Sequence, residues 1–480
     1  MSQLVWKPDV RLEEKIDRWL GERQKEFLED LKDLVAIPSV SGQAEGRYPF
    51  GEPCAKVLEA ALDKAKQYGF IPENYEYYCG GCRMKGSGFG EIGLFSHLDV
   101  VPLGEGWEYP PLECTVKDGF LIGRGTGDNK GPAVAALYAM RFLKEQEISL
   151  KHDVLLYFGC NEEKGMEDIE YFVKTRKAPE FSLVPDTNFP VCYGEKGIFR
   201  ASARAKAGGN LISFKGGSVV NVIPARAEAV IRMERQEEAE KIAEKLSQMP
   251  GIHAKVCGQE KRNVKAAAEG LSRHAAFPQG SVNAVHVLAD ALVKTGGVKG
   301  EAAQAVKGLC VLTSSVHGET TGIPFEDKET GKITCCGTVA VYENEELRLS
   351  FDIRYPSSFT GTQVEDGLRR AAGDLGFTLF AIEDSAPFFI SPDRMEIQTL
   401  CRIADHVLGK TYPPYTMGGG TYARHLPNAV GFGPGLPDQE NPFPQGRGQG
   451  HQPDECICFR QLTDGCKAYI LALLALDQII

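Results

Sequence analysis

The sequence predicts an α/β protein of two domains, one inserted into the other, and three observations lead to this. Between residues 75 and 185, apolar strand-like runs alternate with helical patterns, which is typical of a doubly wound sheet. After Gly197 paired polar/apolar strands are followed by a helix, and from Phe388 the first pattern returns. We therefore predict a first domain with a mixed, largely parallel sheet over 1–197 and 388–480, and an inserted α+β domain over 198–387.

The first domain opens with two helices. Apolar positions at helical spacing predict a helix from Asp9 to Val35, ending before Pro38, and a second from Ala55 to Tyr68. The apolar run Ile92–Phe95 then predicts a buried strand. Similar runs at 153–159 and 181–184 predict further buried strands of the same sheet.

The inserted domain shows the same order of elements twice. Its first strands are followed by a predicted helix at Glu234–Gln248, and a strand-helix order recurs at Glu345–Phe377. The stretch Ala291–Val306 predicts a helix or a linker between them. We expect two related α+β half-units.

Composition excludes several classes of function. The 480 residues carry 54 Lys and Arg against 65 Asp and Glu, a net charge of −11 without a basic block, which argues against nucleic acid or an anionic membrane as a partner. The N-terminus lacks a signal pattern and no apolar run approaches a membrane span, so we expect a cytoplasmic protein with its fourteen cysteines reduced. Cys79 and Cys82 have C-x-x-C spacing, which allows a zinc or redox role, but no second pair lies nearby and we interpret the spacing as incidental.

Chemically active residues gather where the predicted strands end. His97 and Asp99 follow the strand Ile92–Phe95 two residues apart, so they point to the same face, and an acid beside an imidazole can orient a metal-binding histidine. The glycine-rich loop Gly125–Pro132 leads into a predicted helix and carries Asp128, which is either a helix cap or a metal ligand.

Three further segments repeat this theme. Glu162 and Glu163 follow a buried strand, Asp186 follows another, and His451 lies in a Gly/Pro-rich loop. Taken singly, Asp186 and His451 would more often be a cap and a surface histidine. Two histidines and three carboxylates together form a suitable ligand set for two divalent ions, zinc or else manganese or cobalt. The sequence therefore predicts five ligands: His97, Asp128, Glu163, Asp186 and His451.

The motifs HLDV, GTGDNKGP, CNEEKG, PD and GHQPDE, in this order, resemble the five metal-site motifs of the co-catalytic zinc aminoacylase and dipeptidase family. Within that family the chain is most similar to the peptidase V-like dipeptidases. The resemblance implies a zinc-peptidase-like catalytic domain with an inserted lid domain. It also implies hydrolysis of dipeptides with two zinc ions per chain.

The resemblance also implies a role for each residue. Asp128 would bridge the ions, His97 and Asp186 would complete one, and Glu163 and His451 the other. Glu162 would act as general base on the bridging water and then protonate the leaving amine. Asp99 would hydrogen-bond His97, and the Asp128–Asn129 peptide bond would be cis.

Lid residues follow from the same resemblance. His274, in the segment GLSRHAAFP, would stabilise the oxyanion. Asn221 and Arg354 would contact substrate, since an arginine fork recognises carboxylates well, and so would the loop GGGTYAR through Gly418, Gly419, Gly420 and Thr421. The extended lid predicts a chain that supplies His274 to its own site and acts as a monomer.

Three alternatives stay open at this point. The same motifs suit an N-acyl-amino-acid deacylase or desuccinylase, although the extended lid and the glycine loop favour dipeptides. A non-catalytic binding protein on the same scaffold is disfavoured by the intact Glu162 and the full ligand set. A thiol-based redox protein would depend on Cys79 and Cys82.

Overall fold

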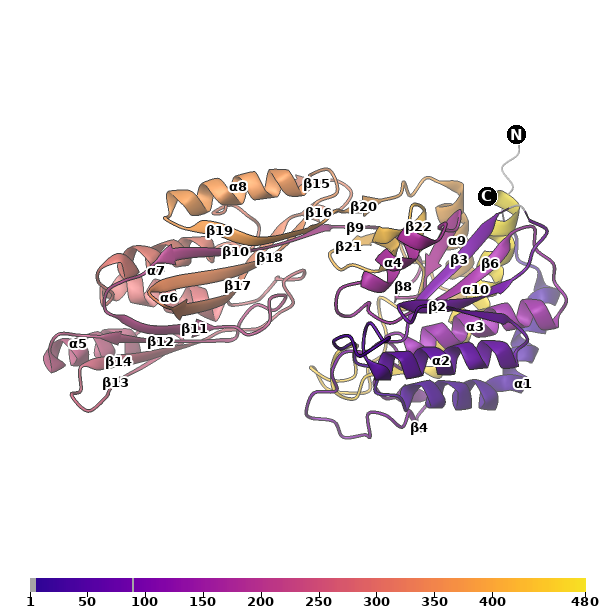
Figure 1. Ribbon diagram of the computed structural model, residues 1–480, viewed down its shortest axis with the longest axis horizontal. Coiled ribbons are helices and arrows are strands. Elements are labelled where there is room, and N and C mark those ends of the chain that lie inside the picture. Colours follow the sequence, from indigo (N-terminus) through magenta and orange to yellow (C-terminus); the bar gives the residue numbers. More distant parts are fainter. Residues whose placement is uncertain (1–5, 89) are drawn as a thin grey trace. The chain divides into compact units, whose positions relative to one another are not determined.

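The computed structural model describes residues 6–88 and 90–480, which form two compact units (Figure 1). The first unit runs up to Tyr193 and includes Ile390–Tyr415 and Thr421–Ile480, while the second contains Gly194–Phe389 and Thr416–Gly420. The sequence predicts boundaries after 197 and before 388, and the units divide after Tyr193 and Phe389. The larger difference concerns residues 416–420, which include the three glycines of GGGTYAR, here called the glycine loop. The sequence predicts them in the first domain, and they belong to the second unit.

Hydrogen bonds explain why the glycine loop clusters with the second unit. Thr416 donates its hydroxyl to the carbonyl of Glu329, and Arg354 donates to the carbonyl of Gly418. A periodic pattern contains no sign of such contacts, because they join segments that are far apart in the sequence.

The first unit contains a mixed sheet and most of the long helices. Its elements are α1 (Val10–Val35), α2 (Glu52–Gln67), β1 (Ile71–Tyr75), β2 (Cys79–Met84), β3 (Glu91–His97), β4 (Thr115–Lys117), β5 (Phe120–Ile122), α3 (Lys130–Glu145), β6 (Asp153–Gly159), α4 (Glu167–Thr175), β7 (Phe181–Val184), β8 (Thr187–Asn188), β9 (Cys192–Glu195), α9 (Met395–Leu408), β21 (Tyr415–Met417), the 3-10 helix η1 (Tyr422–His425), β22 (Ala429–Gly431), β23 (Pro434–Gly435), β24 (Cys456–Cys458) and α10 (Phe459–Ile479). β9 and β21 each cross the division between the units.

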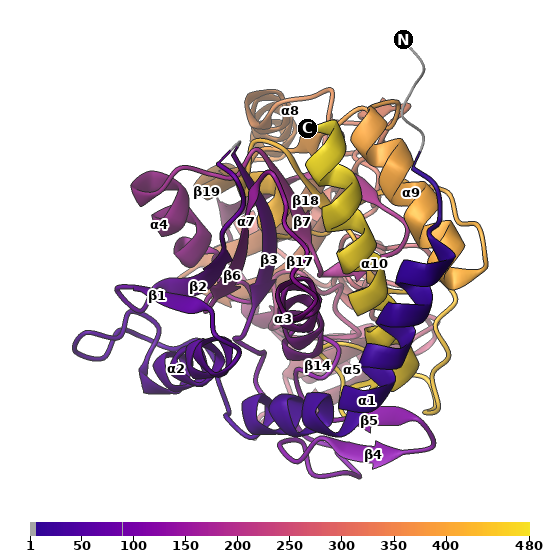
Figure 2. The same ribbon diagram turned by 90° about the vertical axis from the view of Figure 1, so that its right-hand side faces the viewer.

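The large sheet, to which most of these strands belong, has the order β1-β2-β6-β3-β7-β22-β9-β20, where β20 (Phe388–Phe389) comes from the residues of the second unit. Its central strands β6, β3, β7 and β22 are parallel and its outer pairs are antiparallel, so the predicted parallel arrangement holds for the centre. Helices α3 and α10 lie on one side of it and α4 on the other (Figure 2). All four central strands are apolar and buried, which explains why they read as continuous hydrophobic runs.

The second unit is an eight-stranded antiparallel sheet with helices. Its elements are β10 (Gly197–Lys206), β11 (Leu211–Gly216), β12 (Arg226–Arg232), α5 (Gln236–Ser247), β13 (Ile252–Cys257), β14 (Asn263–Glu269), α6 (Ala284–Thr295), α7 (Glu301–Leu312), β15 (Glu326–Asp327), β16 (Gly331–Lys332), β17 (Thr334–Glu343), β18 (Glu346–Tyr355), α8 (Gly361–Asp374), β19 (Thr378–Ser385) and β20 (Phe388–Phe389). The sheet has the order β13-β14-β12-β11-β17-β18-β10-β19. Its halves, β13-β14-β12-β11 and β19-β10-β18-β17, each contain a strand, a helix and an edge strand in succession, as the doubled pattern predicts.

The stretch predicted as helix or linker forms parts of two helices. Gly296 has φ of 66° and ends α6, and α7 begins at Glu301. Glycine adopts this left-handed conformation without steric cost, so it commonly ends helices.

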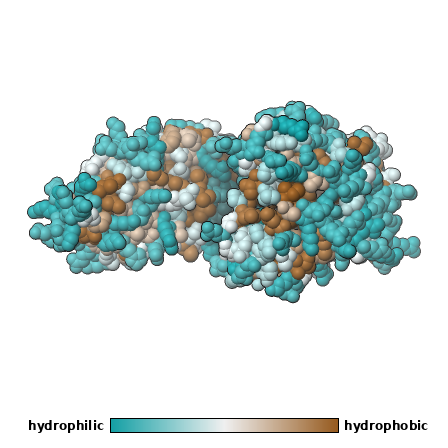
Figure 3. All heavy atoms as spheres, turned by 60° about the horizontal axis from the view of Figure 1, so that its bottom comes forward, coloured by the Kyte–Doolittle hydropathy of each residue, from teal (hydrophilic) through white to brown (hydrophobic). Residues whose placement is uncertain are grey.

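No helix among residues 6–88 and 90–480 has the length and apolar character needed to cross a membrane. The face drawn in Figure 3 is mostly hydrophilic, with apolar areas between.

Candidate active site

Predicted ligands of the first unit converge at the carboxyl ends of its central strands, where open α/β sheets place their sites. His97 is the last residue of β3, and Glu162 and Glu163 follow β6. Asp186 follows β7, and Asp128 lies in the loop that leads into α3. The peptide bond between Asp128 and Asn129 is cis, as the resemblance implies.

Asp128 lies between two histidines. One carboxylate oxygen is 3.0 Å from Nε2 of His97 and the other is 3.2 Å from Nε2 of His451. The same His451 nitrogen is 3.0 Å from Glu163, and the His97 nitrogen is 3.8 Å from Asp186. This divides the predicted ligands into two groups that share Asp128.

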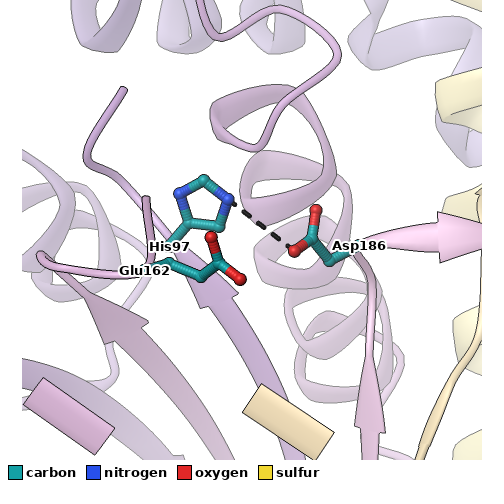
Figure 4. Close-up of side chains that lie close together, drawn as sticks. All are labelled: His97, Glu162 and Asp186. Atoms are coloured by element: carbon teal, nitrogen blue, oxygen red, sulfur yellow. Dashed lines mark ion pairs between the residues drawn. The ribbon is translucent and has the colours of Figure 1, made fainter. Parts of the chain in front are cut away.

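Two sets of three ligand atoms lie within 4.8 Å of one another. One set is His97, Glu162 and Asp186, whose side chains converge in Figure 4, and the other is His97, Asp128 and Glu163. Ligand atoms around one tetrahedral zinc ion lie about 3.3 Å apart, given bonds of about 2.0–2.1 Å. The distances of 3.0–3.8 Å that join His97 and His451 to Asp128, Asp186 and Glu163 are close to this spacing, so these five side chains fit divalent cations.

Electrostatics also favours cations here. Burial raises the pKa of Glu162 well above its usual range, and the nearby charges of Asp186 and Glu163 raise it further, against the opposing effect of His97. Burial likewise raises the pKa of Asp186 to about 8, with the charges of Asp128 and Glu163 adding to the shift and His97 opposing it. Four crowded carboxylates thus compete for two imidazoles, a surplus of negative charge that bound divalent cations would neutralise.

Asp99 has a different main contact from the one expected. Its carboxylate oxygens accept the backbone N–H groups of Glu162 and Glu163, each at 3.1 Å. Nδ1 of His97 lies 3.0 Å from the backbone carbonyl of Asp99 and 3.5 Å from its carboxylate. Asp99 therefore holds the backbone of Glu162 and Glu163 as well as lying beside His97.

Sequence reasoning missed two residues that position Asp128 and Asp186. Asn129 is fully buried, and its amide donates to the Asp186 carboxylate at 3.0 Å. Glu455 is also buried and accepts backbone N–H groups of Gly125, Gly127 and Asp128 at 2.9–3.2 Å. Glu455 was visible as the last residue of GHQPDE, but nothing in its spacing indicated its partners.

Predicted substrate residues of the second unit form a cluster of their own. Nε2 of His274 lies 3.4 Å from the Asn221 amide nitrogen, and its Nδ1 accepts the backbone N–H of Ala276 at 3.1 Å. A neutral imidazole with Nδ1 as acceptor carries its proton on Nε2. His274 can therefore present an N–H donor, as its predicted role requires.

Arg354 is almost fully buried and makes a close ion pair. Its Nε and Nη2 donate to both carboxylate oxygens of Asp352 at 2.6 and 2.9 Å, and Nη1 donates to the carbonyl of Gly418 at 3.1 Å. One edge of the guanidinium is thus already occupied. The hydroxyl of Thr421 accepts the N–H of Ala423 and caps η1.

A family model described as "Peptidase family M20/M25/M40" matches residues 93–475, from within β3 to within α10. The chain belongs to this family. It is therefore a peptidase, and the five motifs singled out in the sequence and the candidate ligand cluster lie inside the matched region.

Curated relatives of this M20-family chain match it along almost their whole length. The Bacillus subtilis (strain 168) protein named "Putative dipeptidase YtjP" is 31% identical over 474 residues, covering 95% of this chain and 98% of that protein. A Staphylococcus epidermidis (strain ATCC 12228 / FDA PCI 1200) protein named "Putative dipeptidase" is 28% identical over 470 residues, covering 95% and 98%.

Solved structures share the fold of this M20-family chain. Human carnosine dipeptidase 1 matches with a TM-score of 0.59 and 19% identity, covering 98% of this chain and 100% of that chain. Aminoacylhistidine dipeptidase from Vibrio alginolyticus matches with a TM-score of 0.54 and 14% identity, covering 93% and 96%. At these identities the likeness shows the fold alone.

The structure does not support a redox or nucleophilic role for the cysteines of this M20-family chain. All fourteen cysteines are free thiols. Cys79 and Cys82 are fully buried in β2, and burial raises the pKa of Cys82 to about 12 and that of Cys79 further. Buried thiols with raised pKa values are poor nucleophiles, which supports the interpretation of the C-x-x-C spacing as incidental.

Proposed function

We propose that this peptidase hydrolyses dipeptides and uses two divalent cations, zinc or else manganese or cobalt. The observation that carries the proposal is the position of Asp128 between His97 and His451, each with a further carboxylate nearby. His97, Asp128 and Asp186 would hold one cation and His451, Asp128 and Glu163 the other. The printed names of the curated relatives support the choice of dipeptides.

Bound divalent cations would polarise the substrate carbonyl and make a water molecule more acidic. In the proposed reaction Glu162 accepts the proton of the attacking water on its carboxylate and later donates it to the leaving amine. Glu162 follows β6 and lies beside His97 and Asp186, next to the proposed cation site, where a water could reach its carboxylate. His274 donates its Nε2 proton as a hydrogen bond to the carbonyl oxygen as negative charge develops there.

A substrate panel tests this proposal. The zinc- and manganese-loaded enzyme should cleave dipeptides, and cleave tripeptides and N-acyl amino acids much more slowly. Amine release is measured for each substrate at equal concentration. Cleavage of the acylated substrates alone would instead favour the deacylase alternative.

Recognition of the substrate carboxylate gives a second expectation. If Arg354 binds the C-terminal carboxylate, amidation of a dipeptide should lower kcat/KM by about 10–100-fold, because a charge-assisted hydrogen bond contributes about 1.5–3 kcal/mol. Arg354→Ala alone would leave the buried carboxylate of Asp352 with only the half-exposed Arg200, at 3.5 Å, in place of its two close hydrogen bonds, a destabilising change. The double variant Arg354→Gln, Asp352→Asn avoids this and should cleave acid and amide almost equally.

Arg348→Gln is the matched control for that measurement. Arg348 lies on the same strand, β18, but is partly exposed and pairs with Glu346. Its removal should leave the ratio between acid and amide unchanged. Equal cleavage of both substrates by the wild type would show that Arg354 does not recognise a carboxylate.

We propose in addition that the protein is cytoplasmic and acts as a monomer. Reduced thiols support a cytoplasmic location, and the doubled second unit supports a monomer.

A further inference from the structure

The four residues that follow β6 have all their backbone N–H groups held by two buried carboxylates. Asp99 accepts those of Glu162 and Glu163, as described above. One oxygen of Asp168 accepts those of Cys160 and Asn161 at 2.7 and 2.9 Å. The position of residues 160–163, which we call the glutamate segment, therefore depends on Asp168 as much as on Asp99.

Asp168 has a third donor on the same oxygen. The hydroxyl of Tyr422 donates to it, and both side chains are at most 1% exposed. Packing around the pair is close, since a Cβ added at Gly159 would overlap the Tyr422 hydroxyl and lie 2.5 Å from Asp168. Buried carboxylates with several donors are held in one orientation, because moving them would leave charge without a partner.

We propose that Asp168 and Tyr422 are positioning residues that hold the glutamate segment and thereby orient Glu162 and Glu163. Neither residue is among the proposed cation ligands. Tyr422 also follows Gly420 by two residues, so the chain that leaves the glycine loop leads directly to this contact. The kinetic part of the inference rests on the proposed function, whereas the structural part does not.

A purely stabilising role for the hydroxyl is the competing explanation. The first unit offers a matched control in Tyr138, whose hydroxyl donates to Asp30 at 2.8 Å between α3 and α1. Both residues of that pair are also buried. Tyr138→Phe removes the same kind of hydrogen bond from a place with no predicted part in the reaction.

Tyr422→Phe should lower kcat for a dipeptide by about 10–100-fold, the usual effect of removing a group that orients a metal-site residue. At saturating zinc the metal content of the same sample should remain as in the wild type, because every proposed ligand, Glu163 included, is still present. Backbone amide hydrogen exchange across the glutamate segment should become about tenfold faster or more, since a hydrogen bond to a charged group is lost. Tyr138→Phe should lower Tm about as much as Tyr422→Phe does. It should leave both kcat and the amide exchange of the glutamate segment unchanged.

Two results would overturn the proposal. One is unchanged kcat and unchanged exchange in Tyr422→Phe, and the other is an equal loss of kcat in Tyr138→Phe. Should Tyr422→Phe not fold, Asp168→Asn keeps the size of the side chain and is measured in the same way. If the wild type cleaves no dipeptide, the proposed function fails, and hydrogen exchange still decides whether these residues hold the segment.

Discussion

Glu162→Gln should keep its cations and lose about 10²–10⁴-fold in kcat, the contribution usual for a general base. An amide of the same size cannot accept the proton of the attacking water. Glu162 lies beside His97 and Asp186, whereas Glu163 makes the contact with His451. The Glu162 substitution should therefore leave the shared carboxylate of Asp128 in place. Metal content and steady-state kinetics on the same preparation measure both effects.

Glu163→Gln is the control for this variant, because the two residues are adjacent and carry the same charge. It should weaken binding of the cation beside His451, and added metal should restore part of the activity. If Glu162→Gln loses metal and Glu163→Gln keeps metal without turnover, the two roles have been exchanged.

Asp128→Ala should abolish paired metal binding and lower activity to the detection limit. Its two oxygens face different histidines, at 3.0 and 3.2 Å, so one substitution removes a ligand from both proposed cations. Metal content after dialysis, with circular dichroism to verify folding, is the measurement. Removal of the metal from the wild type with a chelator should cause a comparable loss, reversed by adding zinc or manganese.

Asp186→Ala tests whether the loss is specific to the shared carboxylate. It should weaken the cation near His97 and leave the one held by His451 and Glu163. Two ions bound normally by Asp128→Ala would show that Asp128 does not bridge.

Much of the fold could be predicted because its signals are local. Helix α1 begins where Asp9 accepts the N–H groups of Arg11 and Leu12, and it ends at Val35 as the apolar spacing predicts. The buried central strands appear as apolar runs, and their ends locate the candidate ligands. Asp352 was also within reach of sequence reasoning, since it shares a strand face with Arg354 two residues later.

Positioning contacts were not predictable in this way. Glu455 is bound to the Asp128 loop across more than 300 residues, and Tyr422 to Asp168 across 254. A carboxylate that accepts backbone N–H groups has no periodicity and needs no particular neighbours in the sequence. The placement of residues 416–420 in the second unit depends on similar distant hydrogen bonds.

The sequence by itself determined the order of strands and helices and the residue types at the strand ends. It also determined the family of the chain. Apolar periodicity and motif spacing are properties of short segments, so both can be recognised without the fold. The resemblance had already paired carboxylates with histidines, but only the tertiary structure decided which carboxylates hold the backbone. Asp128, Asp99 and Asp168 are chemically alike, and what separates a candidate ligand from a support is the set of donors that folding brings to each. Those donors come from distant segments, so their identity is a property of the folded chain alone.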